Sequence, residues 1–261
     1  MSKSYASAYL EHLTQERRPV NTIAAARRVL RSLPDADTAT REDVEAWWTT
    51  RAHLSPATRS NDLAILRTFY AWCRRWEHRD DDPTLRIDAP KVPRGLPRPM
   101  SRADLTRLLP TLPDDLRRAV CLGAYGGLRV SEAAALTWHD VDLETRRVRV
   151  LGKGGKTRLV GMSPLLLDEL LPDTGGNVVT AGGAPYSAAA LQRRVNRAIR
   201  AAGVDCTYHQ LRHRFGTVAL AATGNLLAVS RAMGHASPAT TAIYAATSDA
   251  DLDVIADAVT R

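Results

Sequence analysis

The chain has 261 residues, of which 44% are hydrophobic and 25% charged, which permits one large or two small domains and excludes a disordered or fibrous protein. No stretch approaches the roughly 18 uninterrupted apolar residues of a membrane span and the N-terminus lacks a secretory signal, so we expect a cytoplasmic protein with no membrane partner. The net charge is +8, and residues 86–244 carry 22 basic and 12 acidic side chains whereas residues 245–261 carry one and four. This distribution is typical of a protein that binds a polyanion, although a general preference for arginine would give the same totals.

The first 85 residues predict a small helical domain. Helical patterns cover residues 20–33, 40–53 and 58–76. The last of these helices places five apolar side chains on one face: Leu63, Leu66, Phe69, Tyr70 and Cys73.

A proline-rich segment, residues 86–99, follows and predicts a linker. The second domain, residues 100–261, begins with a helix capped by Ser101 and ends with an amphipathic tail helix at 248–261. Only one segment of it alternates as a strand pair does. We therefore expect a mainly α protein of two domains with a small antiparallel β-sheet.

That segment predicts a β-hairpin with one basic face. Arg147 and Arg149 alternate with valines, and Arg158 follows a Gly-rich turn. The turn holds Lys153 and Lys156, two of only four lysines in the chain. Lysine can give up a proton whereas arginine cannot, so the turn either presents a proton donor or is an ordinary solvated turn.

Residues 207–224 predict a helix that opens with a T-x-x-Q capping box and ends at a glycine. At 100° per residue, His209, Arg212 and His213 share one face of this helix. The opposite face is apolar: Leu211, Phe215, Val218 and Ala222. Histidines at i and i+4 can bind a metal, but the intervening arginine and the absence of a glutamate in the pattern favour an anion site, so we expect no metal.

Two further segments carry candidate residues. A helix at 225–233 leaves His235 just beyond its end, and the next helix carries Tyr244, a residue type that is more often part of a core. Upstream, Arg129 lies on a Gly-rich turn that opens a helix, where backbone N–H groups favour an anion. The alternative is an ordinary helix–helix turn, with Glu132 as a routine first-turn carboxylate.

Four motifs, taken in this order along the chain, resemble the tyrosine recombinases, the phage-integrase and Xer-like family. The motifs are GGLRVSE at 126–132, GKGGK at 152–156, HQLRH at 209–213 and MGHASPATTAIY at 233–244. Each motif alone is weak, but their order and spacing are specific. The resemblance runs from about Ser101 to Tyr244 and implies a helical core-binding domain before it.

The resemblance implies six catalytic residues: Arg129, Lys153, His209, Arg212, His235 and Tyr244. Tyr244 would attack a DNA phosphodiester and form a 3′-phosphotyrosine, releasing a 5′-hydroxyl. Arg129 and Arg212 would hold the non-bridging oxygens, and Lys153 would protonate the leaving group. Glu132 would support Arg129.

The chemistry requires residues of these types. A phosphodiester gains negative charge as it is attacked, and guanidinium groups can stabilise that charge without a metal. A covalent phosphotyrosine keeps the bond energy, so rejoining needs no ATP or other cofactor. The chain accordingly lacks a GxxxxGK[ST] loop.

Basic side chains outside the six predict contacts to DNA phosphates. On the hairpin they are Arg147, Arg149, Lys156 and Arg158. On the helix that contains residues 193–200 they are Arg193, Arg194, Arg197 and Arg200. The last four form a solvated helix face in the alternative interpretation.

The partners follow from the resemblance. They are double-stranded DNA with short inverted-repeat core sites, clamped between the two domains, and three further copies of the chain in a tetramer joined by the tail 248–261. The tail packs within its own chain in the alternative interpretation. An accessory DNA-bending or directionality factor is a further partner of such reactions. Two other functions remain open: a type IB topoisomerase-like strand transferase and a non-catalytic DNA-binding accessory protein.

Overall fold

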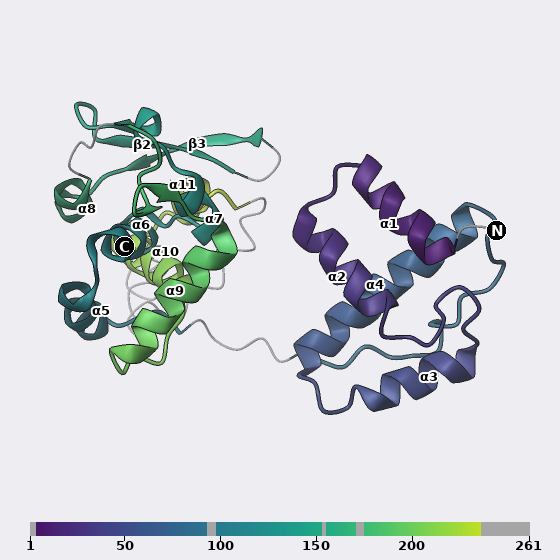
Figure 1. The fold of residues 1–261 in the computed structure, drawn as a ribbon. Coiled ribbons are helices and arrows are strands. Elements are labelled where there is room, and N and C mark those ends of the chain that lie inside the picture. The colour runs from purple at the N-terminus through teal and green to yellow at the C-terminus, as the bar shows by residue number, and fades with distance from the viewer. Residues whose placement is uncertain (1–3, 93–97, 153–154, 171–174, 236–261) are drawn as a thin grey trace, which may run out of the picture. The chain divides into compact units, whose positions relative to one another are not determined.

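A computed structural model describes residues 4–92, 98–152, 155–170 and 175–235 (Figure 1). The chain divides into two compact units, residues 1–95 and 96–261. The described structure is mostly helical, with one three-stranded and one two-stranded antiparallel sheet, so the predicted fold class is confirmed. No helix among the described residues is long and apolar enough to cross a membrane.

The N-terminal unit is built on one long helix. Its elements are α1 (Tyr5–Gln15), α2 (Val20–Leu30), α3 (Arg41–Thr50) and α4 (Pro56–Arg75). In Figure 1, α1 and α2 lie along one side of α4 and α3 lies along the other. All five apolar side chains predicted to face the core from α4 are fully buried, which confirms that amphipathic pattern.

Local capping sets the starts of these helices. The Thr40 hydroxyl accepts from the Asp43 amide while the Asp43 carboxylate accepts from the Thr40 amide, so α3 begins at Arg41. The Ser55 hydroxyl accepts from the Thr58 amide and so caps the start of α4. The unit extends beyond residue 85, because Ile87 is buried in its core and the Ile87 carbonyl accepts from Arg67. The first residues of the expected linker therefore belong to the N-terminal unit.

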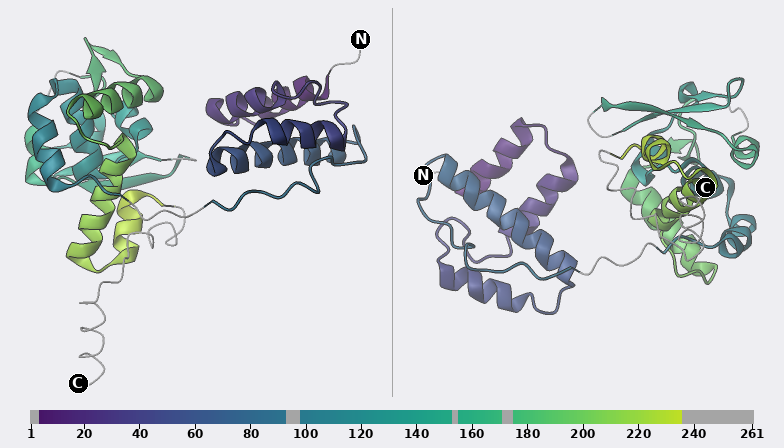
Figure 2. Two further views of the ribbon diagram at one scale, coloured as in Figure 1. Left: turned by 90° about the horizontal axis from the view of Figure 1, so that it is seen from below. Right: turned by 180° about the vertical axis from the view of Figure 1, so that it is seen from behind.

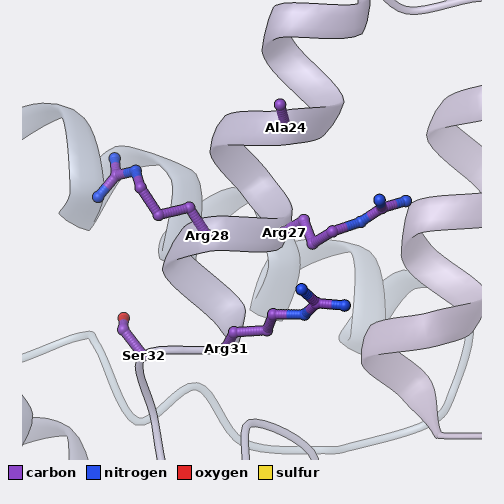
Figure 3. Close-up of a pocket in the computed structure, with 5 residues that line it drawn as sticks. All are labelled: Ala24, Arg27, Arg28, Arg31 and Ser32. Atoms are coloured by element: carbon purple, nitrogen blue, oxygen red, sulfur yellow. The ribbon is translucent and has the colours of Figure 1, made fainter.

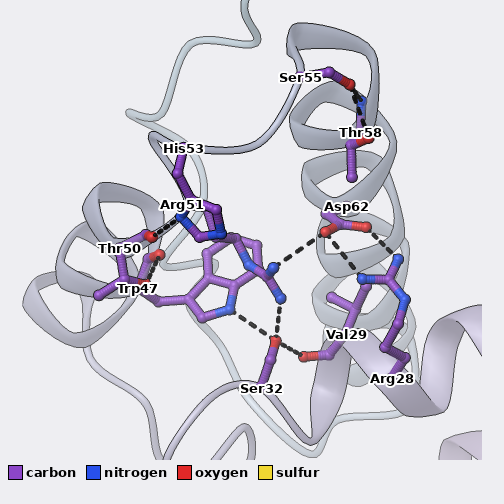
Figure 4. A network of polar contacts seen from close by, with 10 residues as sticks. All are labelled: Arg28, Val29, Ser32, Trp47, Thr50, Arg51, His53, Ser55, Thr58 and Asp62. Atoms are coloured by element: carbon purple, nitrogen blue, oxygen red, sulfur yellow. Dashed lines mark hydrogen bonds and ion pairs between the residues drawn. The ribbon is translucent and has the colours of Figure 1, made fainter.

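A buried carboxylate joins α2, α4 and the end of α3 (Figure 4). Asp62 is fully buried, and its oxygens accept from Arg28 at 2.6 and 3.2 Å and pair with Arg51 at 3.3 Å. The Ser32 hydroxyl accepts from Trp47 Nε1 at 2.9 Å and from Arg51 at 2.5 Å. The network holds Arg51 in place from both sides.

Replacing Asp62 with alanine should lower the free energy of unfolding of this unit by about 3 kcal/mol, because it leaves Arg51 without its carboxylate in a mostly buried position. Urea unfolding of the full chain followed by tryptophan fluorescence measures this, since four of the five tryptophans lie in the N-terminal unit. Glu45→Ala is the control: its exposed pair with Arg41 should cost less than about 0.5 kcal/mol. Equal losses in the two variants would contradict the prediction.

The C-terminal unit surrounds a central helix, α6 (Asp114–Gly126). The other helices are α5 (Arg102–Leu108), η1 (Leu109–Thr111), α7 (Val130–Ala135), η2 (Trp138–Asp140), α8 (Pro164–Glu169), α9 (Ala188–Ala201), α10 (Tyr208–Thr223) and α11 (Leu226–Met233). The strands are β1 (Val141–Asp142), β2 (Arg147–Leu151), β3 (Thr157–Gly161), β4 (Thr180–Ala181) and β5 (Ala184–Pro185). Helix α10 packs closely on α6, where a Cβ at Gly123 would lie 3.1 Å from the Tyr208 ring.

The predicted hairpin is present as β2 and β3, at one edge of this unit (Figure 2). Val148 pairs with Val160 and Val150 with Arg158, so these four side chains share the inner face. Arg147 and Arg149 are exposed on the outer face. The prediction that Arg158 shares their basic face is therefore wrong.

The helix predicted at 207–224 is confirmed as α10, but only part of its apolar face is core. The capping box and the terminal Gly224 are present as expected. Leu211 is fully buried, whereas Val218 is 51% exposed and Ala222 is exposed. Helix α10 lies on α6, and its residues Phe215, Ala219 and Leu220 pack on Val229 and Met233 of α11 in a separate small cluster. The helix therefore extends beyond the main core.

Candidate active site

Arg129 is positioned by the turn between α6 and α7. Gly127 ends α6 with φ +64°, and a Cβ there would lie 2.5 Å from the Phe215 ring, so this turn requires glycine. Arg129 then precedes α7, and its amide donates to Glu132 Oε2 at 2.8 Å. Its guanidinium donates to Glu132 Oε1 at 2.7 Å and to the Gly234 carbonyl at 3.0 Å. The Arg129 side chain remains 37% exposed.

Glu132 is a buried carboxylate shared by three arginines. Besides Arg129, Arg158 donates to Oε1 at 2.9 Å and to Oε2 at 2.8 Å, and Arg212 lies 3.9 Å from Oε2. Burial raises the pKa of Glu132, but hydrogen bonds from Arg158 and from the Arg129 amide outweigh burial and hold this pKa below its ordinary value. The carboxylate is therefore ionised, and the four side chains together carry a charge of +2.

Arg212 is only 2% exposed. It donates to the Gly127 carbonyl and, at 2.5 Å, to the Met233 carbonyl. It thus joins α10 to the turn before Arg129 and to the end of α11. The helical periodicity placed Arg212 beside two histidines on one face of α10 but did not predict that other elements would cover it.

His235 follows directly on α11. Gly234 ends the helix with φ +62°, and the His235 amide donates to the Ser230 carbonyl at 3.0 Å. Burial and then the charges of Arg212, Arg129 and Arg158 lower the pKa of His235 to about 4. This imidazole is therefore neutral at pH 7.

The two histidines of α10 are also held neutral. The His209 and His213 rings lie 4.4 Å apart in an edge-to-face arrangement. Burial and then the charge of Arg212 lower the pKa of His209, and burial and then His209 lower that of His213 to about 4. Each neutral ring has one nitrogen that donates a hydrogen bond and one that can accept a hydrogen bond or a proton.

We predict that His235 titrates near pH 4 in the free protein, far below the ordinary value of 6.5. An NMR titration of the histidine ring protons measures this, with the His235 signal assigned from its absence in His235→Gln. Because the positive surroundings lower the pKa, adding an anion that binds the arginines should raise it. A midpoint at or above 6.5 in the free protein would contradict the assignment.

This arrangement is a cluster of fixed positive charges that can stabilise an anion. The guanidinium groups of Arg129 and Arg212 are fixed by Glu132 and by three backbone carbonyls, those of Gly127, Met233 and Gly234. Fixed cations in a partly dry site stabilise developing negative charge without having to reorganise. Within the described residues no group of three His, Cys, Asp or Glu side chains could hold a metal ion.

Comparison with known proteins agrees with the motifs. A profile of the phage integrase family matches residues 100–251, more than half of the chain. The chain belongs to the phage integrase family. Among curated relatives, tyrosine recombinase XerC of Xanthomonas campestris pv. campestris (strain B100) is 37% identical over 210 residues, which are 74% of this chain and 65% of the relative. XerC of Roseiflexus castenholzii (strain DSM 13941 / HLO8) is 33% identical over 91% of this chain and 87% of the relative.

The first of these phage integrase relatives is matched over only 65% of its length. Among solved structures, the integrase of the Tn1549 transposon in complex with transposon right end DNA is similar with a TM-score of 0.77, over 99% of this chain and 100% of that chain. Its sequence identity is 18%, so this similarity establishes the fold alone.

The structure brings some of the predicted site residues together, and others lie outside the described residues. Arg129, Glu132, Arg212 and His235 meet at one site through the contacts above, with His209 on the same helix as Arg212. Lys153 and Tyr244 lie outside the described residues. Arg158 was predicted to contact DNA phosphates, but it donates to Glu132. Side chains two residues apart on a strand point to the same face, so placing Val160 in the core would have predicted Arg158 on the inner face as well.

The remaining predicted DNA contacts are exposed. Lys156 is exposed next to the hairpin turn, and Arg149 pairs with Asp140 at 3.0 Å. Four arginines lie on the exposed side of α9: Arg193, Arg194, Arg197 and Arg200. Of these, Arg194 is held by Asp115 at 3.5 Å and by Tyr186.

Proposed function

We propose that this phage integrase family member is a site-specific DNA recombinase that cleaves and rejoins strands through a 3′-phosphotyrosine, with neither metal nor ATP. The observation that carries the proposal is the pair Arg129 and Arg212, fixed by one buried carboxylate beside a neutral His235. A phosphodiester is a single anion that becomes more negative as it is attacked, and this site carries the matching excess of positive charge.

In the proposed reaction the Tyr244 oxygen forms a bond to phosphorus and the bond from phosphorus to the 5′-oxygen breaks. Arg129 and Arg212 hold the non-bridging oxygens, and Lys153 donates a proton to the departing 5′-oxygen. The phenol must lose its proton, and tyrosine has an ordinary pKa of about 10. His235 accepts that proton once the bound phosphate offsets the arginine charges that lower its pKa, and the His209 ring N–H donates a hydrogen bond to the phosphate.

DNA phosphates contact the exposed basic side chains of the C-terminal unit. The proposed contacts are Arg147, Arg149, Lys156, Arg193, Arg194, Arg197 and Arg200. Each contact that neutralises a phosphate releases a counterion, so affinity should fall steeply as salt is raised. Arg158 is not included, since its side chain is only 10% exposed and already pairs with Glu132.

The N-terminal unit is proposed as the core-binding domain, the role expected for residues 1–85. A hollow of about 420 Å³ on α2 supports a DNA contact there. Its lining residues are Ala24, Arg27, Arg28, Arg31 and Ser32. In Figure 3, Arg27 and Arg31 extend to the same side of the helix. Two neighbouring guanidinium groups on one helix face suit a DNA backbone.

The proposed partners are duplex DNA with short inverted-repeat core sites, three further copies of the chain on that DNA, and an accessory bending or directionality factor, all in the cytoplasm. Residues 248–261 carry the last four acidic side chains of the chain. We expect this segment to dock on the basic surface of a neighbouring subunit. Removing 248–261 should abolish the cooperative assembly of complexes on paired core sites in a gel-shift titration while single-site binding remains. Unchanged cooperativity would show that the tail packs within its own chain.

The function is tested by trapping the covalent intermediate. The protein is incubated with fragmented DNA from around its own gene and denatured in SDS, and the protein-linked fragments are isolated and sequenced. Tyr244→Phe is treated in parallel. We expect adducts at one inverted-repeat site with the unaltered chain and none with the variant, which keeps the ring but lacks the nucleophilic oxygen.

Other outcomes would replace the proposal. Adducts scattered over the DNA would favour a type IB topoisomerase-like enzyme. Tight, salt-dependent binding without any adduct would favour a non-catalytic accessory protein. Adducts of equal yield with Tyr244→Phe would show that another residue is the nucleophile.

A further inference from the structure

Arg158 bonds both to Glu132, which holds Arg129, and to the end of α11, which precedes His235, although it was predicted to contact DNA. It lies on β3, 26 residues from Glu132 in sequence and 74 from Ala232. We propose that Arg158 is a positioning residue: it sets Arg129 through Glu132 and sets His235 through the end of α11. The inference rests on the proposed recombinase function, because its consequence is measured as strand cleavage.

Three different nitrogens of Arg158 make three hydrogen bonds. Nη1 donates to Glu132 Oε1 at 2.9 Å and Nη2 to Glu132 Oε2 at 2.8 Å, so the guanidinium holds both carboxylate oxygens. Nε donates to the Ala232 carbonyl at 2.8 Å, in the last turn of α11. One side chain thus ties α7 and α11 to the strand.

The same guanidinium lies close to the backbone at Gly234 and less close to the backbone at Gly152. A Cβ added at Gly234, which directly precedes His235, would lie 3.0 Å from Arg158 Nη1 and Cδ. A Cβ added at Gly152 would lie 3.8 Å from Arg158 Nη1 and 4.0 Å from Glu132 Oε1. The end of α11 therefore packs tightly on Arg158, so a change in the position of this side chain would move the backbone that precedes His235.

Glu132 transmits this constraint to Arg129. Its Oε1 accepts from Arg158 at 2.9 Å and from Arg129 at 2.7 Å, so the two guanidinium groups share one oxygen. Without Arg158 the carboxylate could rotate within its buried site, and Arg129 would follow it. A displacement of about 1 Å in a reacting group can slow a reaction by about 100-fold.

Lysine cannot replace Arg158 in this role. It has a single nitrogen, whereas the three bonds come from three nitrogens that point to Glu132 and Ala232 in a fixed fork. Arg158→Lys keeps the positive charge and so separates positioning from charge. Arg158→Met removes both while keeping most of the apolar stem.

The test measures single-turnover formation of the phosphotyrosine adduct on the core site found by trapping, together with DNA affinity and its salt dependence. We expect cleavage by both Arg158→Lys and Arg158→Met to be about 100-fold slower. DNA affinity should change less than about threefold and the salt dependence should not change, because no phosphate contact is lost. Arg117→Met is the matched control, since Arg117 makes a part-buried pair with Glu169 in the same unit, outside the site.

A second substrate separates positioning from a general loss of stability. A methylphosphonate at the cleaved position has one non-bridging oxygen replaced by a methyl group, so it is neutral and depends less on fixed cations. If Arg158 acts through Arg129, the defect of Arg158→Met should shrink from about 100-fold to less than about tenfold on this substrate. A merely less stable protein would show the same defect on both substrates.

The outcomes are distinguishable. Normal cleavage by both Arg158 variants would overturn the inference, as would an equal defect on both substrates or an equal defect in Arg117→Met. Weaker binding with a salt slope lower by about one would make Arg158 a phosphate contact instead. No adduct with the unaltered protein would overturn the proposed function, and the inference with it.

Discussion

Replacing Arg212 with lysine should slow formation of the phosphotyrosine adduct by at least about 100-fold, the usual effect of removing one fixed donor to a developing oxyanion. Arg212 is 2% exposed and bridges two backbone carbonyls, those of Gly127 and Met233. A lysine has one nitrogen and cannot satisfy both carbonyls in this geometry while facing a phosphate. The substitution should therefore also lower the free energy of unfolding, by about 2 kcal/mol, since a buried acceptor loses its partner.

The measurement is a single-turnover cleavage assay at saturating DNA, with urea unfolding of the same samples. Arg214→Lys is the control: Arg214 lies two residues further along α10 and donates a 3.3 Å hydrogen bond to the Met100 carbonyl. We expect its cleavage rate to stay within about twofold of the unaltered chain. Cleavage by Arg212→Lys at a comparable rate would show that Arg212 does not act on the phosphate.

Replacing Glu132 with glutamine should destabilise the C-terminal unit by about 3 to 5 kcal/mol. The amide has nearly the shape of the carboxylate, but its NH₂ group would face Arg129 or Arg158, which are donors only. The three arginines would then lie together with no buried negative charge. Cleavage should fall as well, because Arg129 loses the group that orients it.

The pH dependence of the free energy of unfolding tests whether the ionised Glu132 carboxylate stabilises the C-terminal unit. The pKa of Glu132 is lower in the folded protein than its ordinary value of 4.5, so its stabilisation is complete above that value and is lost as pH falls through the lower folded pKa. The free energy of unfolding is measured for the unaltered chain and for Glu132→Gln from pH 7 to pH 3.5. The difference between the two free energies should become smaller below about pH 4.5. Glu169→Gln, which alters a less buried pair with Arg117, should cost about 1 kcal/mol. A gap that does not change with pH would contradict the assignment.

Signals between neighbours in sequence predicted the elements well. The Thr207–Gln210 capping box and Gly224 bound α10, Ser101 caps α5, and the alternation around Val148 and Val150 gave the hairpin. Each of these signals depends on hydrogen bonds or side-chain direction within a few residues, so each can be recognised in the sequence without knowledge of the tertiary structure. Helix ends were less accurate: α2 ends at Leu30, three residues before its predicted end, because helical patterns continue past the last hydrogen-bonded turn.

The candidate site was predicted as a set of residues but not as an arrangement. Glu132 was expected to support Arg129, and that contact is present at 2.7 Å. The bonds from Arg158 to Glu132 and to Ala232 were not foreseen, and neither was the burial of Arg212. The low pKa values of His213 and His235 also arise from burial and from arginines brought close by folding.

By itself, the sequence determined that this is a mainly α member of the phage integrase family. Motif residues, their order and local periodicity depend only on the order of residues along the chain, so they can be identified without the fold. Only the tertiary structure decided which cation faces inward and which carboxylate it meets. Val218 and Leu211 have the same place in the helical pattern, yet one is 51% exposed and the other fully buried. Periodicity gives the direction in which a side chain points, but burial, ion pairing and pKa depend on what lies in that direction.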